Sequence, residues 1–379
     1  MLSNLNEVYS TSVKWECYPE LLPMWIAESD LGTSAKVENA ILESVLRGEF
    51  GYAPRKAFND LYLAFAEWFD ERYGFPISSD SYYTVPDIMS AYEMTLKVLN
   101  SGDRVVVPTP AYYPFLKIPA RNSIEVSELP MLDVGGRWLI DLEMLEYFFR
   151  FKRAKLLVLC DPHNPTGSVM RHDELEKIFD IVSRYGGIVF NDLVHAPISN
   201  VQIVPYASLD RLAFENSVTA FSISKGWNVS GLKCAQVFSN VPGFHALMGE
   251  MKHRVENGAS RQGIAASIAG YQDNSGWIDT FNTKINNNRD IMLARFEELQ
   301  DTVFKTLSAS KATYFAWLDF SGLSINPYEE LLNYQLKTTA GFEMGSEYFS
   351  YVRVNLAALD SVFKDGISIL GEYLKSLVK

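Results

Sequence analysis

Four short apolar runs separated by helical patterns limit most strongly what this chain can fold into. The runs are Arg104 to Val107, Leu156 to Cys160, Gly187 to Phe190 and Val218 to Ile223. Buried strands that alternate with helices indicate a parallel sheet covered on both faces. A chain of 379 residues is also long enough for a large core and two lobes. The predicted fold class is therefore α/β.

The regions on either side of these runs predict a second, smaller α+β domain and an arm. Gly276 to Leu299 has apolar residues near helical spacing and is long enough to bridge two lobes. Beyond it, ATYFAWLDF and YVRVNLA predict strands, whereas YEELLNYQLK and VFKDGISILGEYLKSLVK predict helices. Near the N-terminus, KWECYPELLPMWIAESD has no clean period and predicts a packed arm before a helix at Ser34 to Leu46.

Lys225 follows the last apolar run, at a glycine-containing turn. Ser222 and Ser224 beside it, and Lys233 beyond it, supply small donors and a second cation. A lysine amine can react with an aldehyde, and the donors and the second cation suit a phosphate dianion. Aldehyde and phosphate together describe pyridoxal 5'-phosphate (PLP). Taken alone, such a lysine is more often a solvated residue at a strand end.

Three further strand ends carry candidate ligands, because ligands of parallel sheets bind beyond the carboxyl ends of the strands. Asn164, in the turn DPHNPTG, offers an amide to a ring oxygen. Asp192 follows a buried run, where a carboxylate is costly unless a cation such as a protonated pyridine nitrogen pairs with it. Tyr112 can stack on a ring. The alternatives are a plain turn, a helix cap, and core packing or stacking by Tyr113.

The segment VPDIMSAYEMTL predicts a helix that begins at Pro86 or Asp87. The free backbone amides of Ile88 and Met89 would then form an anion site at the helix N-terminus. A carboxylate beside a phosphate is unfavourable. We therefore expect the side chain of Asp87 to cap the helix and to point away from the site.

The segments SISKGWNVSGLKCAQ, DPHNPTG and NDLVHAPI resemble the PLP-binding segments of the class I/II aminotransferase family, of fold type I. More narrowly, the chain is similar to the MalY/PatB cystathionine beta-lyase (C-S lyase) branch, and the resemblance covers essentially the whole chain. It implies a large domain with a mostly parallel sheet of the seven-stranded type between helices. The implied boundaries are 1–45 for the arm and part of the small domain, 46–280 for the large PLP-binding domain and 281–379 for the C-terminal small domain.

The resemblance also implies the roles of the cofactor-binding residues. Lys225 would be the catalytic residue and the covalent attachment point of PLP. The other implied cofactor contacts are Asp192 with the ring nitrogen, Asn164 with the phenolic oxygen, His195 beside that oxygen, Tyr112 on the ring face, and Ser222, Ser224, Lys233, Ile88 and Met89 at the phosphate.

For the substrate, the resemblance implies Arg353 as the ligand of an amino acid's α-carboxylate, with Asn164 and Ala27 nearby. A planar, always charged guanidinium suits a carboxylate, although a strand arginine is otherwise usually a solvated edge residue. Tyr52 matches a tyrosine that reaches the phosphate in the neighbouring subunit. The expected protein is therefore an obligate homodimer with a shared active site.

The predicted function is PLP-dependent cleavage of L-cystathionine or related cysteine S-conjugates to a thiol, pyruvate and ammonia. The alternative is a PLP-dependent aminotransferase of an amino acid, which uses the same residues. A second alternative is a PLP-binding regulatory or specialised-metabolism protein without lyase activity. Departures from the family pattern at Asp87, Asp161, Leu193 and Val194 have unknown effects, and three of them (Asp87, Leu193 and Val194) keep this reading open.

Composition narrows the partners and the location. A net charge of -12 disfavours nucleic acid and anionic membranes. No apolar run approaches the roughly 20 residues of a membrane helix, and MLSNLNEVYSTS lacks the regions of a secretory signal. Three widely spaced cysteines fit reduced thiols, and the scattered histidines predict no metal site. We expect a cytoplasmic enzyme with a small-molecule amino-acid substrate.

Overall fold

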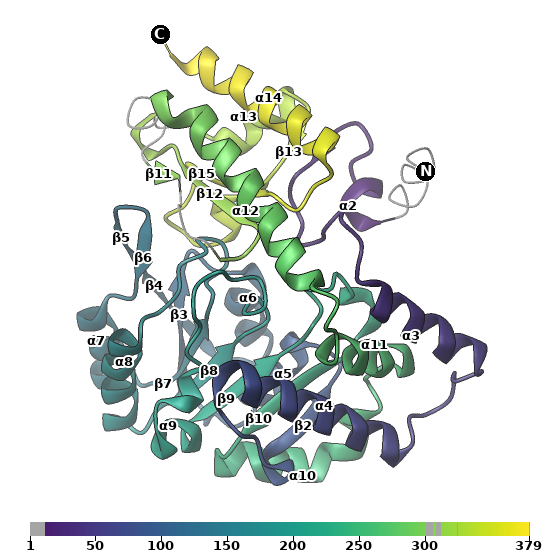
Figure 1. Ribbon diagram of the computed structural model, residues 1–379. Helices are drawn as coiled ribbons and strands as arrows, with labels where there is room; N and C mark the ends of the chain where they lie inside the picture. The colour runs from purple at the N-terminus through teal and green to yellow at the C-terminus, as the bar shows by residue number, and fades with distance from the viewer. Residues whose placement is uncertain (1–11, 300–305, 308–311, 324, 379) are drawn as a thin grey trace.

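Two sheets, one in each lobe, form the framework of the chain in the computed structural model (Figure 1). The structure describes residues 12–299, 306–307, 312–323 and 325–378. A seven-stranded sheet lies in the lower lobe of Figure 1, and a four-stranded sheet lies in the upper lobe. The predicted α/β fold with a smaller second lobe is confirmed. The N-terminal segment expected not to be a secretory signal lies almost entirely outside the described residues.

The large sheet is mostly parallel. In spatial order its strands are β2 (Tyr82–Val85), β10 (Ala235–Ser239), β9 (Ser217–Phe221), β8 (Ile188–Asp192), β7 (Ala154–Cys160), β3 (Arg104–Thr109) and β4 (Glu125–Pro130). β10 runs antiparallel to both of its neighbours, and the other pairings in this sheet are parallel. The four apolar runs of the sequence correspond to β3, β7, β8 and β9, although β9 ends two residues earlier than predicted.

Helices cover both faces of this sheet. One face carries α5 (Ile88–Leu96), α6 (Tyr113–Arg121) and α10 (Pro242–Glu256). The other carries α4 (Arg55–Tyr73), α11 (Arg261–Tyr271), α7 (Leu142–Phe151) and α8 (His172–Arg184). In β3, Val105 and Val107 pack on the first face and Val106 packs on the second. This two-sided burial explains why the strands are apolar without alternation.

Shorter elements complete the large lobe. They are α3 (Ala35–Leu46), which packs on α11, α9 (Arg211–Glu215) and the hairpin of β5 (Leu132–Val134) and β6 (Arg137–Leu139). Ser34 caps α3 by accepting a hydrogen bond from the backbone N–H of Val37, so the predicted helix begins where a capping residue stands.

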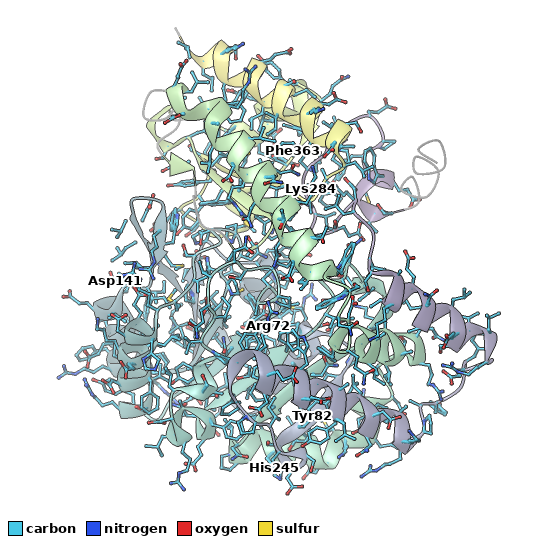
Figure 2. All side chains as sticks on the ribbon, in the orientation of Figure 1. Arg72, Tyr82, Asp141, His245, Lys284 and Phe363 are labelled. Atoms are coloured by element: carbon cyan, nitrogen blue, oxygen red, sulfur yellow. The ribbon has the colours of Figure 1, made fainter. Side chains whose placement is uncertain are left out.

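The upper lobe is built around α12 (Trp277–Phe296), which runs from the large lobe into it (Figure 1). Its sheet consists of β11 (Thr306–Leu307), β12 (Phe315–Asp319), β15 (Tyr351–Asn355) and β14 (Thr339–Ala340). Its other helices are α13 (Pro327–Asn333) and the closing α14 (Asp360–Leu377). Lys284 of α12 and Phe363 of α14 mark this lobe in Figure 2, and Lys284 forms an ion pair with Asp360.

The prediction of one helix over YEELLNYQLK is wrong at its end. The helix α13 stops at Asn333, and Gln335 adopts a left-handed backbone with a φ of 61°. Leu336 and Lys337 then form β13, which pairs in parallel with β1 (Leu22–Pro23) of the N-terminal arm. The partner strand lies more than 300 residues away in the sequence, so no local pattern could reveal the pairing.

A buried ion pair joins the two ends of the N-terminal arm, and the backbone N–H of Asp30 donates to the carbonyl of Ala357 in the upper lobe at 2.9 Å. Lys14 of α2 (Val13–Glu16) donates to Asp30 at 2.8 Å, and both side chains are almost completely buried. Burial lowers the pKa of Lys14 although Asp30 stabilises its charge. Asp30 also accepts a hydrogen bond from the indole N–H of Trp15 at 3.0 Å. These contacts fix the segment between them, which includes Ala27.

No helix of the described residues is long and apolar enough to cross a membrane. The cytoplasmic location and the domain boundaries expected from the sequence stay predictions.

Replacing Asp30 by Asn tests how firmly the arm is held. Asp30→Asn leaves the buried ammonium of Lys14 without a charged partner, so we expect the free energy of unfolding in urea to fall by about 3–5 kcal/mol. Asp60→Asn, in the exposed pair with Lys56, is the matched control and should cost far less. Equal losses in the two variants would contradict a structural role of the buried pair.

Candidate active site

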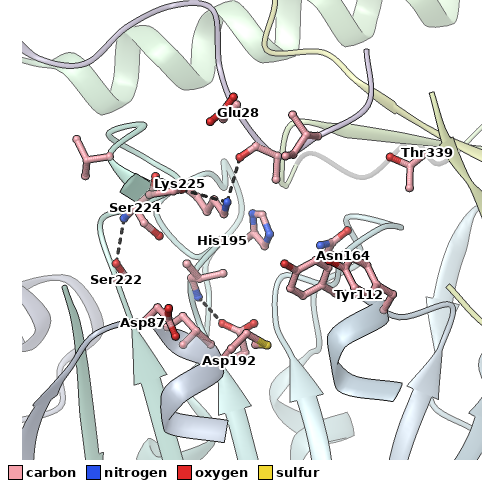
Figure 3. Close-up of a pocket in the computed structure, with 18 of the residues that line it drawn as sticks. Glu28, Asp87, Tyr112, Asn164, Asp192, His195, Ser222, Ser224, Lys225 and Thr339 are labelled. Carbon is pink, nitrogen blue, oxygen red and sulfur yellow. Dashed lines mark hydrogen bonds between the residues drawn. The ribbon is translucent and has the colours of Figure 1, made fainter. Parts of the chain in front are cut away.

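A cavity of about 380 Å³ lies where the carboxyl ends of β7, β8 and β9 face the upper lobe (Figure 3). The predicted site residues that line it are Ala27, Ile88, Met89, Tyr112, Asn164, Asp192, His195, Ser222, Ser224, Lys225, Lys233 and Arg353. Tyr52 is the exception, because it does not line the cavity and its side chain is 85% exposed. The fold therefore brings together residues from strand ends that are far apart in the sequence.

Lys225 projects into this cavity from the turn after β9. Its Nζ donates to the backbone carbonyl of Ala27 at 3.0 Å and to Oγ of Ser230 at 3.2 Å. Burial lowers the pKa of Lys225 to about 8, and the positive charge of Arg353 adds to this effect. Roughly a tenth of this amine is thus neutral, and nucleophilic, at pH 7, far more than for an ordinary lysine.

Asp192 is the last residue of β8 and lies at the floor of the cavity (Figure 3). One carboxylate oxygen accepts from the backbone N–H of Val194 at 2.9 Å, and the other lies 3.8 Å from Sγ of Cys160. Burial raises the pKa of Asp192 to about 6. Within the described residues this carboxylate forms no ion pair, so it is suited to a cationic group of a ligand.

His195 and Tyr112 form the side of the cavity between Lys225 and Asn164 (Figure 3). Burial lowers the pKa of His195 well below its ordinary value, which keeps the imidazole neutral. Its Nδ1 is buried and has no hydrogen-bond partner in the described part of the chain. Burial likewise raises the pKa of Tyr112 to about 12, so its phenol stays neutral at physiological pH.

Arg353 reaches the cavity from β15 of the upper lobe. It donates to Oδ1 of Asn164 at 2.9 Å, to the carbonyl of Trp25 at 2.9 Å and to Oγ1 of Thr339 at 3.1 Å. Its guanidinium carbon also lies 4.0 Å from the ring centre of Phe315. None of its recorded neighbours among the described residues is a carboxylate in ion-pair contact. The buried guanidinium is therefore available to an anionic ligand.

The contact with Arg353 also orients Asn164. Because a guanidinium only donates hydrogen bonds, the oxygen of Asn164 must face Arg353. The NH₂ end of the amide is then directed elsewhere and can donate to a ligand oxygen. This orientation agrees with the donor role expected for Asn164, which stays a prediction.

Groups that can bind an anion collect at the other end of the cavity. α5 begins at Ile88, so the first backbone amides of the helix lack intrahelical acceptors. Ser224 and Lys233 line the same region. The hydroxyl of Ser222 donates to the carbonyl of Cys234 at 2.8 Å and accepts from the backbone N–H of Ser224 at 3.1 Å. A phosphate contact from Ser222 would require this hydroxyl to rotate.

The expectation for Asp87 is half right. It caps α5, as predicted, by accepting from the backbone N–H of Ser90 at 2.8 Å. It does not point away from the site, because its second oxygen accepts from Nζ of Lys233 at 2.8 Å and the residue lines the cavity. The pairing of β2 with β10 places Asp87 opposite Lys233, which the sequence alone did not reveal.

Sequence reasoning missed several lining residues, among them Ser230, Thr339 and Glu343. Ser230 follows Lys225 by five residues, so the turn itself could have suggested it. Thr339 lies in a two-residue strand paired with Arg353, which is too short to give a periodic signal. The sequence also does not indicate that the side chain of Glu343 lines the cavity.

Comparisons with known proteins agree with this geometry. Residues 27–362 match the family described as aminotransferase class I and II. The chain is 30% identical over 325 residues to a cystathionine beta-lyase of Corynebacterium glutamicum, which covers 83% of both chains. It is 27% identical to the cystathionine beta-lyase PatB of Bacillus subtilis, over 94% of this chain and 95% of the relative.

A solved structure supports the same family assignment. A proposed PLP-dependent beta-cystathionase from Corynebacterium diphtheriae has a TM-score of 0.89 at 28% identity, over 99% of this chain and 98% of that chain. The protein therefore belongs to the aminotransferase class I and II family, in the cystathionine beta-lyase branch predicted from its sequence. Pyridoxal 5'-phosphate, the predicted cofactor, is the cofactor of this family.

The residues of the cavity fit this cofactor. Lys225 offers an amine of lowered pKa to the aldehyde, and Asp192 offers an otherwise unpaired buried carboxylate to the ring nitrogen. The orphaned Nδ1 of His195 and the NH₂ of Asn164 lie on the side where a ring oxygen would be received. Among the described residues Asp192 forms no ion pair and Nδ1 of His195 has no hydrogen-bond partner, and a bound cofactor would supply both.

The lowered pKa of Lys225 predicts the pH dependence of cofactor attachment. Only the neutral amine attacks an aldehyde, so the attachment rate should rise with pH and level off above about 8. Stopped-flow absorbance of PLP mixed with apoprotein measures this rate. The reaction of PLP with free lysine, divided at each pH by the neutral fraction of the lysine amines, corrects for titration of PLP itself. Lys225→Ala should show no attachment. A corrected rate that still climbs steeply between pH 9 and 10 would exclude a lowered pKa.

Proposed function

We propose that the protein is a PLP-dependent C-S beta-lyase that cleaves L-cystathionine or a related cysteine S-conjugate to a thiol, pyruvate and ammonia. The observation that carries this proposal is the placement of Arg353. Its buried guanidinium faces the same cavity as Lys225 and, among the described residues, pairs with no carboxylate. It suits the α-carboxylate of an amino acid whose amine lies at the cofactor.

When bound, PLP supplies an aldehyde for an amine and a conjugated ring that accepts electron density from the substrate's α carbon. Lys225 would hold this aldehyde when no substrate is bound. Asp192 would keep a proton on the ring nitrogen, because its carboxylate has no other cationic partner in the described chain. Asn164 would donate to the ring oxygen, and its own oxygen accepts from the guanidinium of Arg353.

The released amine of Lys225 is the base that takes the α-proton. A base is most effective when its pKa lies near the working pH, and a pKa of about 8 meets this condition. Arg353 holds the carboxylate so that the α C–H bond faces this amine. The β carbon–sulfur bond then breaks, the thiolate leaves with the bonding electrons, and hydrolysis of the remaining fragment yields pyruvate and ammonia.

Incubation of the purified PLP-loaded protein with L-cystathionine tests the reaction type. We expect pyruvate and ammonia to form in equal amounts without a 2-oxo acid acceptor, and we expect Arg353→Lys to lower kcat/KM about 100-fold, because it removes the bidentate contact with the carboxylate. Lactate dehydrogenase coupled to NADH consumption measures the pyruvate.

Other outcomes of this assay point to the other candidates. Turnover that requires a 2-oxo acid would identify an aminotransferase, which uses the same residues but returns the proton to the cofactor instead of expelling a thiolate. No turnover over a panel of cysteine S-conjugates and amino acids, with PLP bound, would identify a PLP-binding protein without lyase activity.

The active site is completed by a second copy of the chain in this proposal. Large apolar residues at the end of α3 and in the segment that leads to α4 are exposed, with Leu46 at 76%, Phe50 at 73% and Tyr52 at 85%. Exposed apolar residues gathered on one segment are typical of an interface. Tyr52 would reach the phosphate in the partner's cavity, which agrees with the finding that it does not line the cavity of its own chain.

Light scattering after size exclusion should therefore give about twice the chain mass of 42.8 kDa. Phe50→Asp should raise the monomer fraction, whereas Phe151→Asp, exposed at the end of α7 on the opposite edge of Figure 1, should not. Mixing the inactive variants Tyr52→Ala and Lys225→Ala should restore activity, because one hybrid site has both residues intact. A monomeric and fully active protein would rule out the shared site.

A further inference from the structure

Asp87 is a carboxylate inside the region that binds the anionic end of the cofactor. One of its oxygens accepts from both the backbone N–H and the hydroxyl of Ser90, each at 2.8 Å. The other accepts from Nζ of Lys233 at 2.8 Å. The side chain of Asp87 is 37% exposed and that of Lys233 is 54% exposed. Lys233, a cation expected at the phosphate, is thus already paired.

The main chain imposes this pair. β2 and β10 are antiparallel, with Val85 opposite Ala235. Asp87 lies two residues after Val85 and Lys233 lies two residues before Ala235, so the same antiparallel register places Asp87 opposite Lys233. Lys233 has a left-handed backbone, with φ 51° and ψ 74°, and its carbonyl accepts from the backbone N–H of Ser260 at 3.0 Å. The two side chains meet because the backbone positions of both residues are fixed. In most exposed ion pairs, two long side chains must instead lose conformational freedom to hold one geometry.

The ion pair lies among groups suited to a phosphate. The first amides of α5, at Ile88 and Met89, and the side chain of Ser224 line the same part of the cavity. Burial alone would raise the pKa of Asp87, but the hydrogen bonds from Lys233 and Ser90 outweigh it and hold the pKa below its ordinary value. The carboxylate is therefore charged at neutral pH and opposes any dianion bound beside it.

We propose that Asp87 is an internal competitor of the cofactor's phosphate for Lys233. In the protein without cofactor, Asp87 neutralises the cation. A phosphate that enters must share or take over Lys233 and must tolerate the adjacent carboxylate. Asp87 thus lowers the affinity for PLP through its phosphate end, and leaves the affinity for the ring and aldehyde unchanged. This inference rests on the proposed function only in that the ligand is PLP.

Asp87→Asn is the decisive variant. Asparagine is nearly isosteric and is itself a good helix cap, so α5 keeps its capped N-terminus while the charge is lost. Asp141→Asn is the matched control. Asp141 caps α7 by accepting from the backbone N–H of Met144 at 3.0 Å, does not line the cavity, and lies at the far edge of the molecule (Figure 2).

Dissociation constants of PLP and of pyridoxal, which lacks the phosphate, are measured on apoprotein by quenching of tryptophan fluorescence. We expect Asp87→Asn to bind PLP about tenfold more tightly than the wild type, with pyridoxal affinity unchanged. Asp141→Asn should change neither constant. Equal or weaker PLP binding by Asp87→Asn, or an equal gain for pyridoxal, overturns the proposal.

Inorganic phosphate separates this inference from the proposed function. The rise in Tm of the apoprotein with added phosphate should be larger for Asp87→Asn than for the wild type, and chloride at matched ionic strength should produce no difference. This measurement needs neither PLP nor turnover. If the wild type fails to bind PLP, the proposed function fails while the phosphate result still decides the role of Asp87. If the variant and the wild type respond equally to phosphate, the role of Asp87 is refuted even in an active lyase.

Discussion

The candidate active site depends on burying charged groups that the described chain does not itself neutralise. A buried, unpaired carboxylate or guanidinium costs several kcal/mol, yet Asp192 and Arg353 are each 4% exposed and neither forms an ion pair within the described residues. The strands that carry them are buried on both sides, so neither side chain can turn to water. The cavity is thus arranged for ligands that bring a cation to one wall and an anion to the other.

The sequence predicts well which residues come together in the cavity when those residues directly follow a strand. Parallel strands place their carboxyl ends on one edge of the sheet, so Asn164, Asp192 and Lys225 had to converge once the four runs were recognised as strands. β10 was missed because Gln236 interrupts its apolar run. In the structure Gln236 is buried and accepts a hydrogen bond from the hydroxyl of Tyr271. The sequence of the strand alone does not reveal this hydrogen bond. β4 was missed because polar residues divide it, and β2 was missed because it is only 4 residues long.

The sequence did not reveal how strands that are far apart in the chain pair with one another. The direction of Asp87 is set by the antiparallel pairing of β2 with β10, and the end of α13 is set by pairing with β1. Both are contacts between segments that are remote in the sequence.

The structure also explains Asp161, which departs from the family pattern and whose effect the sequence did not reveal. One of its oxygens accepts from the backbone N–H of Met170, and burial raises its pKa to about 8, so it is largely a protonated acid at neutral pH.

The N-terminal arm belongs to both lobes at once. Its residues Leu22 and Pro23 pair with β13 of the upper lobe, while Ser29 exchanges two hydrogen bonds with Asn228, three residues beyond Lys225. Between these anchors, the carbonyl of Ala27 holds the amine of Lys225. Any hinge movement between the lobes must therefore displace this segment, and with it the amine of Lys225. The position of the amine of Lys225 is thus coupled, through the arm, to the relative position of the two lobes.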